Sequence, residues 1–126
     1  IEDIEHPIIR ECLRLMPVDR IEITTLADIP AGTGLGSSSS FTTALLAALA
    51  VYRREHVPTA RLAQLACHVE IDKLEKPIGK QDQYAAAFGG IQVHTFATTG
   101  CVRQDPIPVP DYLEDHLLLF FTGYTR

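Results

Sequence analysis

The sequence predicts an α+β fold for a chain of 126 residues. Three observations favour this class: helical and strand-like hydrophobic patterns both occur, they do not alternate strictly as strand–helix–strand units, and no internal repeat is present. Hydrophobic residues make up 46% of the chain and charged residues 21%, which is enough apolar surface to bury a core. The length corresponds to one domain or to part of a larger one.

The first elements predicted along the chain are a short helix and a strand. Apolar residues recur at helical spacing over 6–16, and Pro7 suits a first helical position. Residues 20–29 are rich in β-branched side chains and predict a strand. After a glycine- and serine-rich loop, a long apolar helix is expected over 38–54. Its expected buried stripe consists of Ala44, Leu45, Ala48, Leu49 and Tyr52.

Two further helices follow. One is predicted over 59–75, with Thr59 as its N-cap. The charged residues 72–76 are expected on a solvated helix end. A shorter helix is predicted over 81–88, where Gly89 supplies a C-cap signal.

The last part of the chain is expected to be extended. Alternating residues predict a strand over 91–96, a turn at 98–100 and a second strand over 101–103 that pairs back. Three prolines within 105–110 lack the N–H that a central strand donates, so an extended connector is expected there. The apolar run 117–121 predicts one more strand.

Charge and cysteine content limit the partners and the compartment. The formal net charge is −5, which disfavours electrostatic capture of nucleic acid or of an anionic membrane. No apolar run approaches the roughly 20 residues of a membrane span, and no secretory signal is visible. The scattered Cys12, Cys67 and Cys101 form no CxxC pair, and the first two are expected in the core. We therefore expect a cytoplasmic protein.

The loop between the predicted strand and the long helix carries the chemistry. Gly32, Gly34 and Gly36 allow positive φ and a close approach of backbone to ligand. Consecutive N–H groups in such a turn, together with a helix N-terminus, bind anions. The hydroxyls of Ser37 and Ser38 can donate to phosphate or coordinate Mg²⁺. This pattern indicates a phosphate site built from backbone.

Three other interpretations of the loop compete with this one. A P-loop requires a lysine after its last glycine, but Ser37 follows Gly36. The dinucleotide fingerprint requires GxGxxG, whereas the spacing here is GxGxG. The third interpretation is a glycine-rich turn whose serines only cap the helix. The glycine spacing alone leaves this last interpretation open.

A wider sequence pattern resembles a known family. The run Pro30-Ala31-Gly32-Thr33-Gly34-Leu35-Gly36-Ser37-Ser38 resembles the second motif of the GHMP kinases, P-x-x-x-G-L-G-S-S. Residues 77–90, PIGKQDQYAAAFGG, resemble one sugar-kinase branch of that family, the heptose 7-phosphate kinases. The resemblance covers roughly 6–126. It implies the α+β N-terminal domain of these kinases, a two-layer arrangement of sheet and helices like ribosomal protein S5 domain 2.

The resemblance also implies roles for individual residues. The loop residues expected to wrap the ATP phosphates are Gly32, Gly34, Leu35, Gly36, Ser37 and Ser38. Ser38 and Glu70 are the implied Mg²⁺ ligands and Asp82 the implied catalytic carboxylate. Charge suggests a second catalytic residue, Lys80, which lies two residues before Asp82 and is expected to keep it ionised and to face the transferred phosphoryl group. From the residues alone, Asp82 could equally cap a helix, and Glu70 and Lys80 could lie on a solvated surface. Glu70 lies on the same face of the predicted helix as Ala63 and Ala66, so partial burial is also expected. An unpaired buried carboxylate is costly, so it should then have a partner.

The activity implied is transfer of the ATP γ-phosphoryl group to the anomeric hydroxyl of a heptose 7-phosphate. Alternatives are a fucose, galactose or mevalonate type of acceptor, and a non-catalytic nucleotide-binding module. The expected partner is a small sugar phosphate, and a homo-oligomer is allowed. The chain begins at Ile1 and is expected to be internal to a longer protein, with 1–113 in the ATP-binding domain and 114–126 beginning a truncated C-terminal domain. Alone, it is expected to be inactive.

Overall fold

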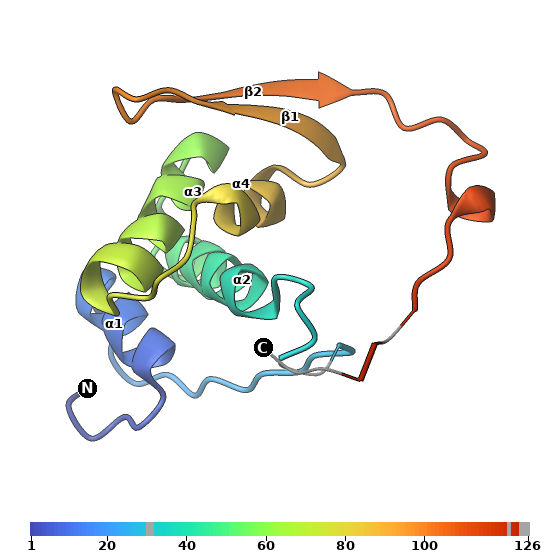
Figure 1. Ribbon diagram of the computed structural model, residues 1–126. Helices are drawn as coiled ribbons and strands as arrows, with labels where there is room; N and C mark the ends of the chain where they lie inside the picture. Colours follow the sequence, from blue (N-terminus) through green and yellow to red (C-terminus); the bar gives the residue numbers. More distant parts are fainter. Residues whose placement is uncertain (30–31, 121, 124–126) are drawn as a thin grey trace.

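The computed structural model describes residues 1–29, 32–120 and 122–123. A group of helices packs together, and a β-hairpin lies across one side of the group (Figure 1). The helices are α1 (Pro7–Leu15), α2 (Ser37–Tyr52), α3 (Thr59–Cys67), the π-helix η1 (His68–Lys73), α4 (Gln81–Phe88) and the 3-10 helix η2 (Glu114–His116). The strands are β1 (Ile91–Phe96) and β2 (Val102–Ile107). This mixture confirms the predicted α+β class.

Local signals set the ends of α1 as predicted. Pro7 occupies the first turn, and the ring Nδ1 of His6 accepts a hydrogen bond from the Ile9 N–H at 3.4 Å. The helix ends where the Met16 N–H donates to the carbonyl of Cys12 at 2.8 Å. Proline has no backbone N–H, and this is no loss in the first turn of a helix because an N–H there has no carbonyl acceptor within the helix.

Helix α2 is central, because α1, α3, η1 and α4 all contact it. Leu45 and Leu49 are buried as expected, and Leu46 is completely buried. The rest of the expected stripe is wrong, since these three residues are exposed: Ala44, Ala48 and Tyr52. Nearly every residue in the second half of α2 is apolar, so the sequence pattern alone does not select its buried face.

The hydrophobic core lies between the helices. The main cluster consists of Ile8, Cys12, Leu13, Met16, Leu45, Leu46, Leu49, Ala50, Leu65, Ala66 and Val69. A second cluster, Ala63, Cys67 and Tyr84, packs against residues that include Phe88 and Val102. Burial raises the pKa of the Cys12 thiol to about 12 and that of Cys67 to about 11. The two cysteines are therefore core residues, as expected.

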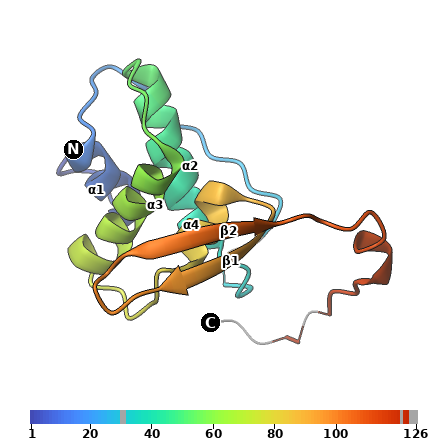
Figure 2. The ribbon, with the colours of Figure 1, turned by 90° about the horizontal axis from the view of Figure 1, so that it is seen from above.

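The hairpin is antiparallel and lies over α3 and α4 (Figure 2). Ile91 pairs with Ile107 and Phe96 with Val102, around a turn in which Gly100 has φ +86°. The connector expected over 105–110 is wrong in its first residues, because β2 continues through a proline to Ile107. Both strands of a two-stranded sheet are edge strands, and an edge strand tolerates proline.

Two predicted strands are not found. Described residues of 20–29 form no ladder: two isoleucines pack against the helical core, whereas Leu26 is 95% exposed. Residues 117–120 are also unpaired, on an arm that leaves the hairpin (Figure 2), and position 121 lies outside the described residues. A strand requires a neighbour, and none lies beside either segment in the described part of the chain. The described helices include none long and apolar enough to cross a membrane.

Candidate active site

The glycine loop has the predicted left-handed backbone. Gly32, Gly34 and Gly36 have φ values of +79°, +78° and +70°. Gly36 is the N-cap of α2, and its carbonyl accepts from the Ser40 N–H at 2.9 Å. No described side chain caps this helix, so its first amides are available to an anion. Positions 30 and 31 of the motif lie outside the described residues.

Asp82 lies directly against this loop. A Cβ placed on Gly36 would be 3.6 Å from Cγ of Asp82 and 3.7 Å from its Oδ2. The contact arises because α4, which begins one residue before Asp82, packs beside the start of α2 (Figure 1). Asp82 is exposed, so the structure places a solvent-accessible carboxyl group next to the N-terminus of α2.

Glu70 is completely buried behind the loop and accepts four hydrogen bonds. Its Oε1 accepts from Ser38 Oγ at 2.5 Å and from Lys76 Nζ at 2.9 Å. Its Oε2 accepts from Ser39 Oγ at 2.8 Å and from Gln83 Nε2 at 2.7 Å. The expected burial with a partner is thus observed, and the two predicted metal ligands touch each other.

The electrostatics of this cluster favour an ionised carboxylate. Burial by itself raises the pKa of Glu70, but the hydrogen bonds from Ser38, Lys76, Ser39 and Gln83 outweigh it and hold this pKa below its ordinary value. Glu70 is therefore negatively charged at neutral pH, and among the ion pairs of the described residues it has one positive partner.

That partner, Lys76, was missed by the sequence analysis. Its ammonium donates to Ser38 Oγ at 2.6 Å as well as to Glu70, and its side chain is 30% exposed. The expectation of a solvated helix end over 72–76 is therefore wrong for this residue. Lys76 lies beyond the end of η1, in a turn where its N–H donates to the Glu70 carbonyl at 3.1 Å, so the chain folds back toward this residue.

Ser39 and Gln83 are also missed members of the cluster. Both are buried, although serine and glutamine are usually exposed. The available signal is weak: four serines open an apolar helix, so some must face inward, and Gln83 follows Asp82 directly. The Oε1 atom of Gln83 finds no partner among the described residues.

Ser37 and Ser38 have different surroundings. Ser38 faces Glu70, whereas Ser37 lines a cavity of about 340 Å³ between the extended segment and α2. This cavity is mainly apolar and is lined by residues that include Leu26, Ile29, Leu35 and Phe41. Of the two serines, only Ser38 is joined to the buried carboxylate by a described hydrogen bond.

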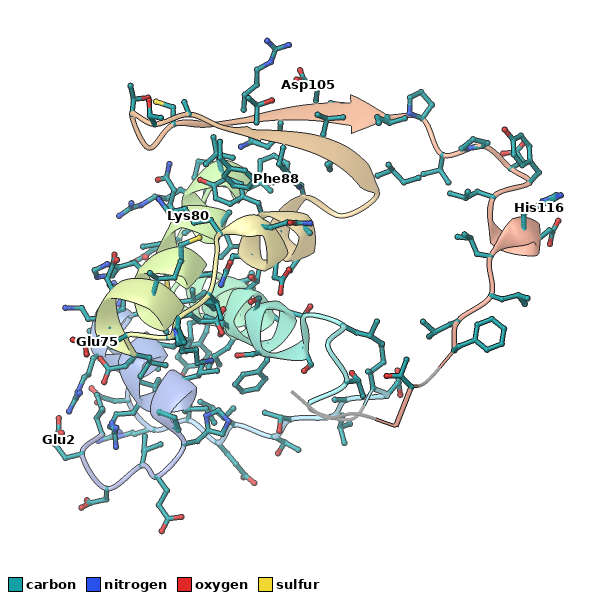
Figure 3. All side chains as sticks on the ribbon, viewed as in Figure 1. Glu2, Glu75, Lys80, Phe88, Asp105 and His116 are labelled. Atoms are coloured by element: carbon teal, nitrogen blue, oxygen red, sulfur yellow. The ribbon has the colours of Figure 1, made fainter. Side chains whose placement is uncertain are left out.

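Lys80 lies apart from the Glu70 cluster. Figure 3 shows it at the upper end of the segment that connects η1 to α4, whereas Glu75 lies at the lower end. Lys80 lines a cavity of about 430 Å³ together with the hairpin turn around Gly100. Among the ion pairs of the described residues, none joins it to Asp82. Its catalytic role stays a prediction.

Similarity to known proteins agrees with this architecture. The chain is 34% identical over 106 residues to the D-glycero-alpha-D-manno-heptose 7-phosphate kinase of Campylobacter jejuni, an alignment that covers 81% of this chain and 31% of that protein. It is 35% identical over 99 residues to a galactokinase of Thermococcus kodakarensis, covering 79% of this chain and 28% of that protein. An L-fucokinase/L-fucose-1-P guanylyltransferase of Bacteroides fragilis is 34% identical over 113 residues, an alignment that covers 84% of this chain and 12% of that protein.

A solved structure shows the same fold. The crystal structure of a D-glycero-D-manno-heptose 1-phosphate kinase from Bacteroides thetaiotaomicron superposes with a TM-score of 0.74 at 32% identity, over 86% of this chain and 36% of that one. The chain therefore spans about a third or less of the relatives it matches. The family model for the GHMP kinases N terminal domain matches residues 7–90, which include the glycine loop, Glu70 and Asp82. The chain belongs to the GHMP kinase family.

Proposed function

We propose that the chain forms the nucleotide-binding part of an ATP-dependent sugar kinase whose acceptor is D-glycero-D-manno-heptose 7-phosphate. The observation that carries this proposal is the position of the Asp82 carboxyl group, whose Cγ lies 3.6 Å from where a Cβ on Gly36 would stand, at the uncapped start of α2. Amides of a glycine loop and of a helix N-terminus hold phosphate groups. A nucleotide held there has its phosphates close to a carboxylate that solvent and a small substrate can reach.

The reaction that fits these residues is a single displacement at phosphorus. The carboxylate of Asp82 accepts the proton of the anomeric hydroxyl while the oxygen of that hydroxyl bonds to the γ-phosphorus. The bond from the γ-phosphorus to the bridging oxygen breaks, and ADP leaves. The products are the heptose 1,7-bisphosphate and ADP. In this step the glycine loop positions the phosphates, and Asp82 orients the nucleophile.

The residues present also fit a Mg²⁺ ion. Ser38 Oγ and Glu70 Oε1 are hard oxygen donors 2.5 Å apart, and the ammonium of Lys76 already lies against both, so this position accepts positive charge. No cluster of three His, Cys, Asp or Glu side chains occurs within the described ranges, so the proposed donor set is one hydroxyl and one carboxylate. When bound, Mg²⁺ neutralises charge on the transferred phosphoryl group.

The choice of acceptor rests on similarity. A heptose 7-phosphate kinase and a structure named as a heptose 1-phosphate kinase are among the relatives, which supports a heptose phosphate. Galactokinases and a fucokinase are also among them, so galactose and fucose are the alternative acceptors. A mevalonate-type acceptor and a non-catalytic nucleotide-binding module complete the set to be tested.

The deciding experiment compares Asp82→Asn with wild type in the full-length protein. ATP turnover is measured with heptose 7-phosphate, galactose, fucose and mevalonate, and Mg·ATP binding is measured in parallel. The matched control is Asp105→Asn on β2, which also removes one surface carboxylate. We expect turnover with the heptose, a loss of about 10²-fold or more in Asp82→Asn with nucleotide binding retained, and no loss in the control.

Other outcomes decide against the proposal. Turnover of another sugar but not of heptose 7-phosphate refutes the acceptor. Nucleotide binding without turnover of any acceptor identifies a binding module. We also propose that 1–113 belong to the ATP-binding domain and that 114–126 begin the next one. The 126-residue piece is then expected to lack activity that the full-length protein has.

A further inference from the structure

We propose that Lys76 is an exchangeable internal cation: its ammonium occupies the cation position between Ser38 and Glu70 in the metal-free protein and leaves it for the bound phosphates when Mg²⁺ is present. This inference rests on the proposed function, because it concerns the same Ser38–Glu70 pair. It adds a phosphate-binding residue and a competition between two cations to that site.

The Glu70 carboxylate is fully hydrogen-bonded in this structure. A carboxylate offers about four lone-pair sites, and four donors reach this one, two on each oxygen. The Ser38 oxygen also accepts from Lys76. The Glu70 carboxylate therefore has no free position for a metal unless one donor leaves, and Lys76 occupies one of the two acceptor positions of the Ser38 hydroxyl.

The donors to Glu70 differ in how easily they can leave. Ser39 and Gln83 are buried and belong to the packed helices α2 and α4. Lys76 is the charged donor, its side chain is 30% exposed, and it lies beyond the end of η1 on the segment that leads to α4. An ammonium and a divalent cation repel each other, and a lysine stem has freely rotating bonds. Lys76 is therefore the donor that gives way.

The released ammonium stays close to the proposed phosphate site. Ser38 is in the first turn of α2, two residues after the last glycine of the loop. Lys76, released from Ser38, is still beside the amides that are proposed to hold the phosphates. Lysine binds phosphate as a mobile point charge. Lys76 thus compensates the Glu70 charge in the empty site and contributes to nucleotide binding in the filled site.

The test uses the full-length protein with Lys76→Met, which removes the charge but keeps an unbranched stem. The control is Lys73→Met, which removes an exposed lysine three residues earlier. The first measurement is the Mg²⁺ concentration that gives half of the thermal stabilisation produced by MgCl₂ alone. We expect this Mg²⁺ concentration to fall about tenfold or more in Lys76→Met, because Mg²⁺ no longer has to displace one hydrogen bond between charged groups. It should stay unchanged in the control. The second is the Kd for Mg·ATP at saturating Mg²⁺, which we expect to rise in Lys76→Met only.

A third measurement works even if Lys76→Met does not fold. An NMR spectrum of the lysine ammonium groups of the wild type should contain one slowly exchanging signal, which Lys76→Arg removes and which MgCl₂ shifts or broadens. Unchanged Mg²⁺ affinity in a folded Lys76→Met protein, or a Lys76 signal that MgCl₂ leaves unaffected while Mg·ATP still binds, overturns the inference. If wild type and control bind no Mg·ATP at all, the proposed function itself fails.

Discussion

Replacing Glu70 by glutamine tests whether the buried cluster holds the site together. The glutamine side chain has nearly the same shape, but it carries no charge and only one of its two ends accepts hydrogen bonds. Its amide nitrogen would therefore face two of the four donors that now reach the carboxylate. In addition, Lys76 would lose its only acidic partner among the described ion pairs.

The expected cost follows from this geometry. Breaking a buried ion pair by removing one partner costs about 3–5 kcal/mol. The Lys76 side chain is 30% exposed and can be rehydrated, so the lower end applies. We expect Glu70→Gln to lower the free energy of unfolding by about 3 kcal/mol. The measurement is urea unfolding of the full-length protein at pH 7, read as a change in midpoint at constant m-value.

The effect should depend on pH in one direction. Because the pKa of Glu70 is lowered in the folded state, the stability it contributes is fully present above the ordinary glutamate pKa and is lost as pH falls through the lowered value. Protonated Glu70 and the glutamine that replaces it are both neutral, so the difference between wild type and variant should shrink as pH falls below about 4.

The control is Glu75→Gln, which removes one exposed carboxylate five residues later and should change stability by less than about 0.5 kcal/mol. Equal stabilities of Glu70→Gln and Glu75→Gln at pH 7 would refute the reasoning. So would a difference from wild type that grows on acidification.

Three further predictions concern the loop, the cysteines and the core. Gly36→Ala and Gly34→Ala should each destabilise by about 1–2 kcal/mol, because both backbones have positive φ, +70° and +78°. Both variants alter the loop that is proposed to hold the phosphates, so both should lower turnover, but Gly36→Ala should lower it further because only it places a methyl group beside the Asp82 carboxyl. Among the cysteines, exposed Cys101 should react rapidly with a thiol reagent at pH 8, whereas Cys12, with a pKa of about 12, should react only on unfolding. Leu46→Ala should cost about 2–5 kcal/mol in urea unfolding, because this side chain is fully buried.

Each of these predictions has a contradicting result. Equal turnover in the two glycine variants would show that the position of Asp82 beside Gly36 does not matter for the reaction. Reaction of a second thiol at the rate of the first, checked with Cys101→Ser, would show that the core opens. A cost for Leu46→Ala no larger than that of exposed Val51→Ala would place Leu46 outside the core.

At the glycine loop, the conformation expected from the sequence agrees with the backbone geometry of the structure. The positive φ angles of three glycines follow from local chemistry alone, since residues with a Cβ resist that conformation. The placement of Asp82 against Gly36 required more: it depends on α4 packing beside α2. Its role as a proton acceptor stays a prediction until the variant is assayed.

The amino-acid order determined those features that neighbouring residues decide: the start of α1 at a proline, the left-handed glycines and the turn at Gly100. Contacts between distant residues decided the rest. Residues 20–29 have a strand-like composition, yet pairing needs a neighbouring strand that no local pattern supplies. Lys76 reaches Glu70 and Ser38 because the turn after η1 and the packing of η1 against α2 bring together groups 6 and 38 residues apart.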